Sequence, residues 1–174
     1  MASQSEPGGV PKGITLNKLW ANLHGGSTHF PIALMIASVL FDALAFLVRA
    51  PYKQDPQAVG FRRLPGALAS LVDKRDLHAA GFYTLLLGAL ASLVAVLSGM
   101  VISAWLFFGQ GTLAKHHDFV WPAFGLMIGL AVWRLVVRDE ATRPAFGIYL
   151  VVAAVTAGLM AAAGYYGGEL LGGD

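Results

Sequence analysis

The 174-residue chain contains no cysteine, and only 13% of its residues carry a charge. Without cysteine, the chain forms no disulfide, binds no iron–sulfur cluster through its own thiolates and attaches no haem through thioethers. With so few charges, it cannot present the hydrated surface that a water-soluble domain needs. Any metal or cofactor therefore depends on histidine, methionine, carboxylate or backbone ligands.

Apolar residues dominate what remains. They make up 56% of the chain, and the mean hydropathy is +0.63. We predict an all-α integral membrane protein, a four-helix up-down bundle, because the length allows about four spanning helices of roughly 20 residues each. The predicted organisation is a flexible polar tail over 1–13 and one membrane domain over 14–174. The tail lacks the basic-then-apolar pattern of a secretory signal, so we expect it to be retained.

Four apolar segments define the predicted membrane helices, at about 31–48, 79–108, 119–137 and 145–166. Pro31 and Pro144 are expected in first helical turns, where the missing N–H costs nothing. Asp76 and Asp118 are expected as N-caps of the second and third helices. Before the first segment, apolar residues at helical spacing predict a short helix that lies flat on the membrane and ends at Gly25 and Gly26. This apolar stripe contains Leu16, Leu19, Trp20 and Leu23.

Basic residues predict the orientation of the chain. We call side A the membrane face at which the first spanning segment begins, and side B the opposite face. Side A holds Lys12, Lys18 and Lys115, and side B holds Arg49, Lys53, Arg62, Arg63, Lys74, Arg75, Arg134, Arg138 and Arg143. This bias predicts a multi-pass protein of the bacterial inner (cytoplasmic) membrane with side B cytoplasmic and both termini periplasmic. The basic side B loop, with a possible short helix over 67–72, is expected to meet anionic lipid rather than nucleic acid.

Histidines are the candidate ligands. His24 and His29 precede the first spanning segment and His116 and His117 precede the third, so all four are expected at side A. In an up-down bundle the first and third helices lie across a diagonal, and a ligand from each can reach a planar cofactor between them. A b-type haem needs one imidazole on each axial side of its iron. We predict one such haem, with His29 and either His117 or His116 as the best pair and His24 as a neighbouring or alternative ligand.

Only one haem is expected, because a second haem near side B would need two more ligands at that depth. The remaining histidine, His78, begins the second segment alone on side B. We interpret it as a structural residue at a helix start, or as a hydrogen-bonding partner of a quinone or a lipid headgroup. The alternative for the whole set is that these are interfacial histidines that bind no cofactor.

Two acidic residues complete the candidate site. Asp42 lies inside the first apolar segment, where an isolated carboxylate would cost several kcal/mol. It is expected to pair with Arg134 or Arg49 and so hold the bundle together, or to relay protons toward a quinone. Glu169 follows a glycine pair on side A, where it could neutralise a cofactor or face water.

The motif HGGSTHFPIAL, the acid at Asp42, a histidine at the start of the third helix and the closing AGYYGGELL together carry a family resemblance. The chain resembles an uncharacterised family of bacterial four-helix membrane proteins marked by a His-x4-His-Phe-Pro-Ile-Ala-Leu box, over about 23–171. The resemblance implies the four-helix architecture and singles out His24, His29, Asp42 and one of His116 or His117. A haem-binding or redox role is a suspicion attached to this family.

The leading functional hypothesis is a membrane electron-transfer subunit that links a redox partner at the outer face to the quinone pool. The catalytic chemistry would belong to that partner, so no catalytic residue is assigned here. One alternative is a cofactor-free membrane anchor or assembly subunit of a larger complex. Another is a non-haem copper, zinc or iron site built from the four side A histidines and Glu169. Transport is the weakest hypothesis, since there is no obvious pathway and no obvious internal repeat.

Overall fold

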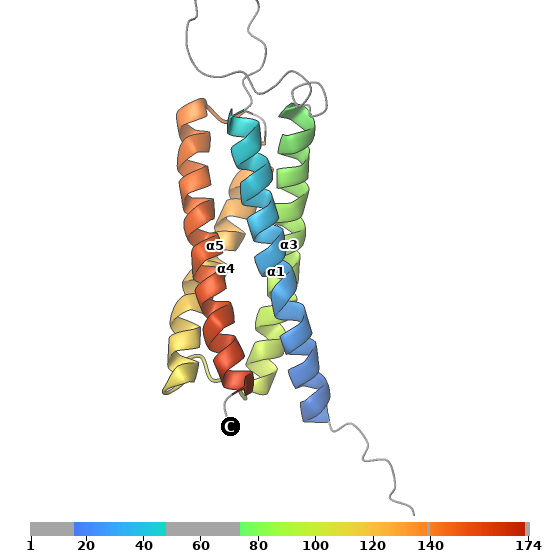
Figure 1. Cartoon of the computed structure of the whole chain (residues 1–174), viewed down its shortest axis with the longest axis vertical. Coiled ribbons are helices and arrows are strands. Elements are labelled where there is room, and N and C mark those ends of the chain that lie inside the picture. Colours follow the sequence, from blue (N-terminus) through green and yellow to red (C-terminus); the bar gives the residue numbers. More distant parts are fainter. Residues whose placement is uncertain (1–15, 48–73, 139, 173–174) are drawn as a thin grey trace, which may run out of the picture.

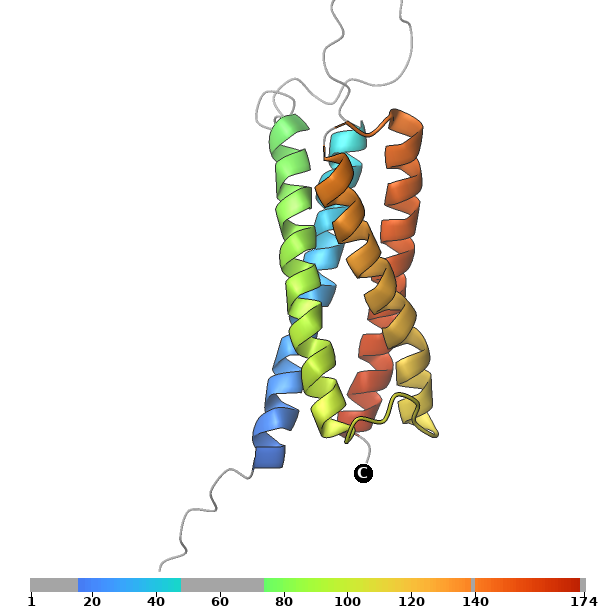
Figure 2. The same ribbon diagram turned by 180° about the vertical axis from the view of Figure 1, so that it is seen from behind.

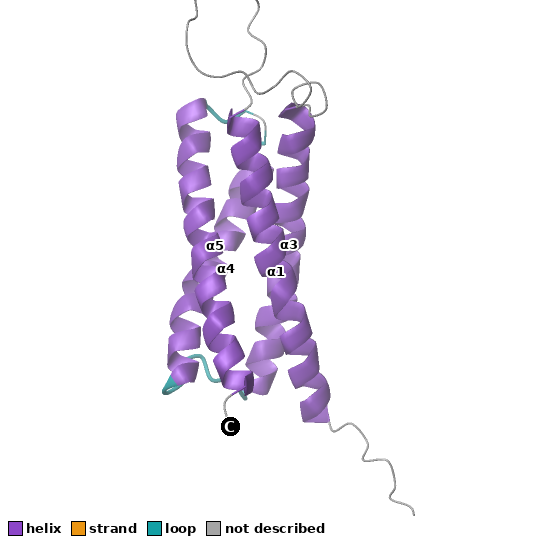
Figure 3. Cartoon of the chain, viewed as in Figure 1, coloured by secondary structure: helices purple, strands orange, loops and turns teal. Residues whose placement is uncertain are grey.

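The computed structural model describes residues 16–47, 74–138 and 140–172, and four long helices account for most of them (Figure 1). The helices are α1 (Leu16–Leu47), α3 (Lys74–Ile102), α4 (Thr112–Val137) and α5 (Arg143–Gly172). Each is long and apolar enough to cross a membrane, and the described residues contain no strand (Figure 3). The all-α four-helix bundle is therefore confirmed.

The helices alternate in direction along the bundle, so the N-terminal end of α1 and the C-terminus lie at the same end, side A (Figures 1 and 2). Helix α1 packs mainly on α3, and α4 packs mainly on α5; further contacts join α1 to α5 and α3 to α4. Helices α1 and α4 make no close backbone approach and face each other across a diagonal. The bundle therefore consists of two antiparallel hairpins, α1–α3 and α4–α5.

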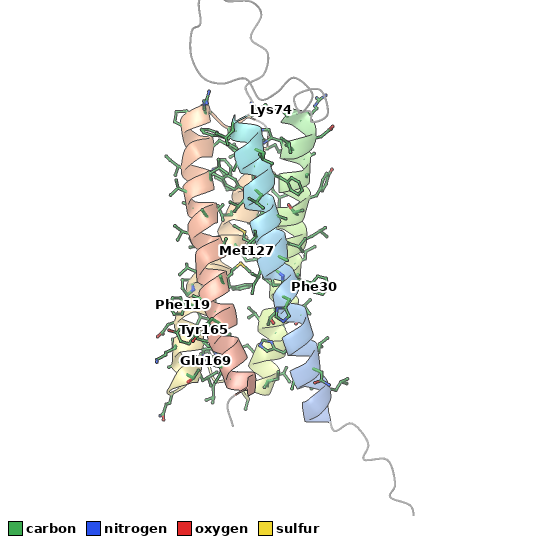
Figure 4. The ribbon with its side chains drawn as sticks, in the orientation of Figure 1. Phe30, Lys74, Phe119, Met127, Tyr165 and Glu169 are labelled. Atoms are coloured by element: carbon green, nitrogen blue, oxygen red, sulfur yellow. The ribbon has the colours of Figure 1, made fainter. Side chains whose placement is uncertain are left out.

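Small residues bring the helix backbones close together in the middle of the bundle. The side chains of Met35, Leu85 and Met127 are fully buried there, and Figure 4 shows Met127 pointing into the interior. A Cβ atom at Gly88 would lie 2.6 Å from Cε of Met127 and 3.3 Å from Cβ of Leu34. Because lipid is as apolar as the side chains, close van der Waals packing of this kind drives helix association in membranes.

The predicted surface helix before α1 is wrong, because α1 continues without a break from Leu16 through Gly25 and Gly26. The hydroxyl groups of Ser27 and Thr28 donate to the carbonyls of His24 and Gly25, at 3.1 and 3.0 Å. The side chain of His24 also binds α3, which holds this part of α1 against the bundle. As a result, Pro31 lies inside α1 rather than in its first turn.

Other helix ends differ from the apolar segments that predicted them. Helix α4 begins at Thr112, after a Gly111 N-cap, so Asp118 lies within the helix and is not its cap. Asp76 lies in the first turn of α3, whereas Pro144 is at the start of α5 as predicted. The helices begin before the predicted apolar segments because polar residues at the membrane edge remain helical. The predicted C-terminal end of the second helix at 108 is wrong, since α3 ends at Ile102 and a loop with a positive φ angle at Ala104 and Trp105 follows. The tail over 1–13, the side B loop with its possible helix over 67–72, and Arg49 lie outside the described residues.

Candidate functional site

The first candidate ligand, His24, is held by α3 at the side A end of the bundle. Its Nδ1 atom lies 3.0 Å from the carbonyl oxygen of Ala95 and 3.1 Å from the hydroxyl oxygen of Ser98. That hydroxyl donates to the same carbonyl at 2.9 Å. A carbonyl oxygen carries no hydrogen, so Nδ1 must be the donor in its bond. In a neutral imidazole this leaves the lone pair on Nε2, the atom free to bind a metal.

The second candidate ligand, His116, is held by α5 in the same way. Its Nδ1 atom lies 2.8 Å from the carbonyl oxygen of Ala163, so Nδ1 is again the donor and Nε2 keeps the lone pair. His24 and His116 come from the diagonal helices α1 and α4 and lie at the same end of the bundle, side A. Histidines that bind metals typically donate their second N–H to a carbonyl or carboxylate in this way.

His117 is the most buried of the side A histidines, with an exposed fraction of 7%. Its ring centroid lies 5.9 Å from that of His116 and 6.2 Å from that of Trp121. Its Nδ1 atom is buried and has no hydrogen-bond partner among the residues that the structure describes. Buried polar atoms of this kind are uncommon and need an explanation. A bound group beside His116 that accepts or donates a hydrogen bond would supply one.

His29, the predicted best ligand, lies outside this group. Its side chain is exposed, and five residues along an α-helix turn it by about 140° from His24. Its neighbour Phe30 also points away from the bundle (Figure 4). Glu169 is exposed at side A, where it interacts with the exposed hydroxyl of Tyr165. The structure thus brings together His24, His116 and His117, and leaves His29 and Glu169 at the surface.

A compact non-haem metal site is not formed by the described residues. Within 16–47, 74–138 and 140–172, no three histidine, aspartate or glutamate side chains are arranged to hold a metal ion. The two oriented imidazoles of His24 and His116 therefore suit a group that takes two protein ligands better than a bare ion that needs three or more.

The predicted pair between Asp42 and Arg134 is confirmed near side B. The Asp42 side chain has no exposed surface, and that of Arg134 is 3% exposed. One carboxylate oxygen accepts a hydrogen bond from Nη1 of Arg134 at 3.1 Å, and the other accepts one from the hydroxyl of Tyr149 at 2.9 Å. Each carboxylate oxygen therefore has a partner, which is what a buried charge requires.

The guanidinium of Arg134 extends this network to all four helices. Its Nη2 atom donates to the carbonyl of His78 at 2.9 Å, and the His78 ring nitrogen Nδ1 lies 3.8 Å from Asp42. Aromatic rings of three residues surround the guanidinium, with centroids at 5.3 to 5.9 Å: Phe82, Phe146 and Tyr149. These cation–π contacts compensate part of the hydration that Arg134 loses.

Two α1–α3 contacts close the network. The hydroxyl of Ser38 donates to the carbonyl of Gly81 at 2.8 Å. A Cβ atom at Gly81 would overlap the Asp42 carboxylate, so only glycine fits at this position without a shift.

Sequence reasoning missed several of these partners. Tyr149 gave no signal because it looks like any other aromatic residue of an apolar helix. The carbonyls that hold His24 and His116 belong to alanines, whose side chains say nothing about them. Both carbonyls belong to an Ala-x-x-x-Gly pattern, at Ala95 and Gly99 and at Ala163 and Gly167, but the same pattern at Ala21 and Gly25 and at Ala154 and Gly158 keeps it from marking the site.

Comparisons with known proteins agree with this membrane architecture. No curated protein and no solved structure matches the chain. A family model described as "Predicted membrane protein (DUF2231)" matches residues 21–172, nearly the whole of the bundle. The chain therefore belongs to this family of predicted membrane proteins.

Proposed function

We propose that this chain is a haem-binding electron-transfer subunit of the bacterial inner membrane, with one haem b near side A held by His24 and His116. The single observation that carries the proposal is the matched pair of hydrogen bonds from Nδ1 of His24 and His116 to helix carbonyls, at 3.0 and 2.8 Å. Both bonds leave the Nε2 lone pair available, on helices that face each other across the bundle.

The donor set fits haem better than the alternatives. Haem iron takes one imidazole nitrogen on each axial side and needs no third protein ligand. The unpartnered Nδ1 of His117 supplies a further polar contact for a group bound beside His116. When bound, haem would supply one-electron transfer; the chain itself would hold the ring, choose the tautomer of its ligands and exclude water. His24 replaces His29 in this proposal because His29 is exposed.

The partners follow from the position of the site. With side A periplasmic, as the basic residues predict, the subunit would link a redox partner at the outer face to the quinone pool. The chemistry on the substrate would belong to that partner. Membrane lipids surround the rest of the bundle.

The test is optical. The protein is purified from its native membrane in mild detergent with its partners retained, and the dithionite-reduced minus oxidised spectrum and a pyridine haemochrome assay are recorded. We expect a b-type spectrum with about one haem per chain, from the single bis-histidine site. The spectrum should disappear in His24→Ala and in His116→Ala and persist in the matched controls His29→Ala and His78→Ala.

Two results would contradict the proposal. Absence of a Soret band in freshly prepared complex would remove haem binding and favour the cofactor-free anchor subunit. Loss of the haem in His29→Ala but not in His24→Ala would restore His29 as the axial ligand and refute the assignment made from the hydrogen bonds. Size-exclusion profiles of all variants establish that a lost spectrum does not reflect a lost fold.

A further inference from the structure

Two glycines lie directly against the two candidate ligands. A Cβ atom at Gly99 would lie 2.9 Å from Cε1 and 3.4 Å from Nδ1 of His24. A Cβ atom at Gly167 would lie 3.1 Å from Cε1 and 3.3 Å from Nδ1 of His116. The same two ring atoms are therefore nearest to the glycine on both sides of the bundle.

Helix geometry explains why glycine is needed there. In an α-helix the carbonyl of residue i accepts from the N–H of residue i+4, and the Cβ atom of that later residue tilts back toward the helix N-terminus. A side chain at i+4 thus shields one side of the carbonyl oxygen. Gly99 and Gly167 stand four residues after Ala95 and Ala163, whose carbonyls bind the two imidazoles. Without a Cβ atom, each carbonyl is open to a second donor.

The two arrangements stand at constant offsets in the sequence. We call two residues equivalent when one lies in α1 and the other 92 positions later in α4, or one in α3 and the other 68 positions later in α5. The first set pairs His24 with His116, Met35 with Met127 and Asp42 with Arg134. The second pairs Ala95 with Ala163, Gly99 with Gly167, Leu85 with Ala153, Gly88 with Thr156 and Ser92 with Met160.

Two pairs of equivalent residues are in direct contact. Asp42 and Arg134 form an ion pair. His78 packs its ring against Phe146, its equivalent in α5, at 4.9 Å. Residues at these constant offsets therefore meet across the bundle in two pairs, both near side B.

We infer that Gly99 and Gly167 are positioning residues that fix the tautomer and the ring orientation of His24 and His116, and so present two equivalent Nε2 atoms to one bound group. The haem part of this inference rests on the proposed function. The tautomer part concerns the protein alone and can be measured without any cofactor.

The experiment compares glycine substitutions that do and do not meet a histidine. In Gly99→Ala and Gly167→Ala the added methyl group displaces the imidazole and weakens its hydrogen bond to the carbonyl. The matched control is Gly168→Ala, adjacent to Gly167, and a second control is Gly158→Ala, also on α5; an added Cβ at either meets nothing within 4 Å. Loss of the hydrogen bond that orients a metal-binding histidine typically weakens metal binding about 10–100-fold. We therefore expect haem affinity to fall by that factor in Gly99→Ala and Gly167→Ala and to stay unchanged in the two controls.

Two spectroscopic readouts separate positioning from general destabilisation. The low-spin electron paramagnetic resonance signal and the reduction potential should change in Gly99→Ala and Gly167→Ala and stay as in the wild type in both controls. Histidine ¹⁵N chemical shifts of the haem-free protein should show the hydrogen on Nδ1 of His24 and His116 in the wild type, and a mixture of tautomers in the two variants.

The outcomes distinguish this inference from the proposed function. Wild-type affinity and spectra in both glycine variants would refute positioning while leaving a haem protein. If the protein binds no haem, the ¹⁵N shifts of the wild type still test the inference. A hydrogen on Nε2 of either histidine overturns it, and a hydrogen on Nδ1 of both supports it. Because the wild type alone gives this answer, a variant that fails to fold does not remove the test.

Discussion

Separating Asp42 from Arg134 should cost more stability than any exposed substitution in the bundle. The exposed fractions of these residues are 0% and 2%, so no water replaces a lost partner. Removing one member of such a pair typically costs about 3–5 kcal/mol. We expect Asp42→Asn to lower the free energy of unfolding by about 3 kcal/mol, because the guanidinium of Arg134 keeps its contacts with the carbonyl of His78 and with three aromatic rings. We expect a loss nearer 5 kcal/mol for Arg134→Met, since the described partners left to the carboxylate are the hydroxyl of Tyr149 and a histidine at 3.8 Å.

The double variant Asp42→Asn/Arg134→Met removes both charges and should lose about 4 kcal/mol rather than the sum of about 8 kcal/mol, because no unpaired charge stays buried. Reversible unfolding in mixed micelles, followed by circular dichroism, gives the four free energies of the cycle. The exposed Asp118→Asn is the matched control and should stay within about 0.5 kcal/mol of the wild type. Hydrogen bonds between membrane helices average only about 0.6 kcal/mol. A coupling energy that small would refute the view that this pair locks the four helices.

Two further predictions concern the backbone. Gly81→Ala should destabilise the bundle by about 1–3 kcal/mol, because its methyl group overlaps the Asp42 carboxylate and overpacking costs that much. The control is Gly125→Ala, whose Cβ meets nothing within 4 Å. It should be neutral or slightly stabilising in the same unfolding assay. Ala104 has a φ angle of +51° in the α3–α4 loop, so Ala104→Gly should raise the free energy of unfolding by about 1 kcal/mol, whereas Ala91→Gly within α3 should lower it by a similar amount. A decrease in Ala104→Gly would contradict this account of the loop.

Much of the fold could be predicted from the sequence because membrane helices are marked by long apolar segments. Hydropathy does not predict where the helices begin and end. Helix α4 starts at Thr112, well before the apolar segment at 119, because polar residues at the membrane edge keep helical hydrogen bonds. The pair Gly25–Gly26 looked like a helix end. Each glycine costs about 1 kcal/mol in a helix, and the contacts of His24 with α3 compensate that cost.

The candidate site could be predicted in part. Spacing and depth found the side A histidines and the pair of Asp42 with Arg134. They ranked His29 above His24, because position along the chain says how deep a residue lies and not which way it faces. The acceptors for the two imidazoles are backbone carbonyls, which any residue type supplies. The glycines that uncover those carbonyls follow a spacing that recurs elsewhere in the chain.

The two polar layers of the bundle differ in how their residues satisfy one another. Near side B the equivalent residues are Asp42 and Arg134, which carry opposite charges and satisfy each other directly. At side A the equivalent residues are both histidines, and the Nδ1 atom of each already donates a hydrogen bond to a helix carbonyl. The remaining Nε2 atoms can only accept, so neither can be the partner of the other. A donor or a metal centre between them would satisfy both at once. The unlike pair therefore completes itself and holds the helices together, whereas the like pair would be completed by a third group, for which we propose haem.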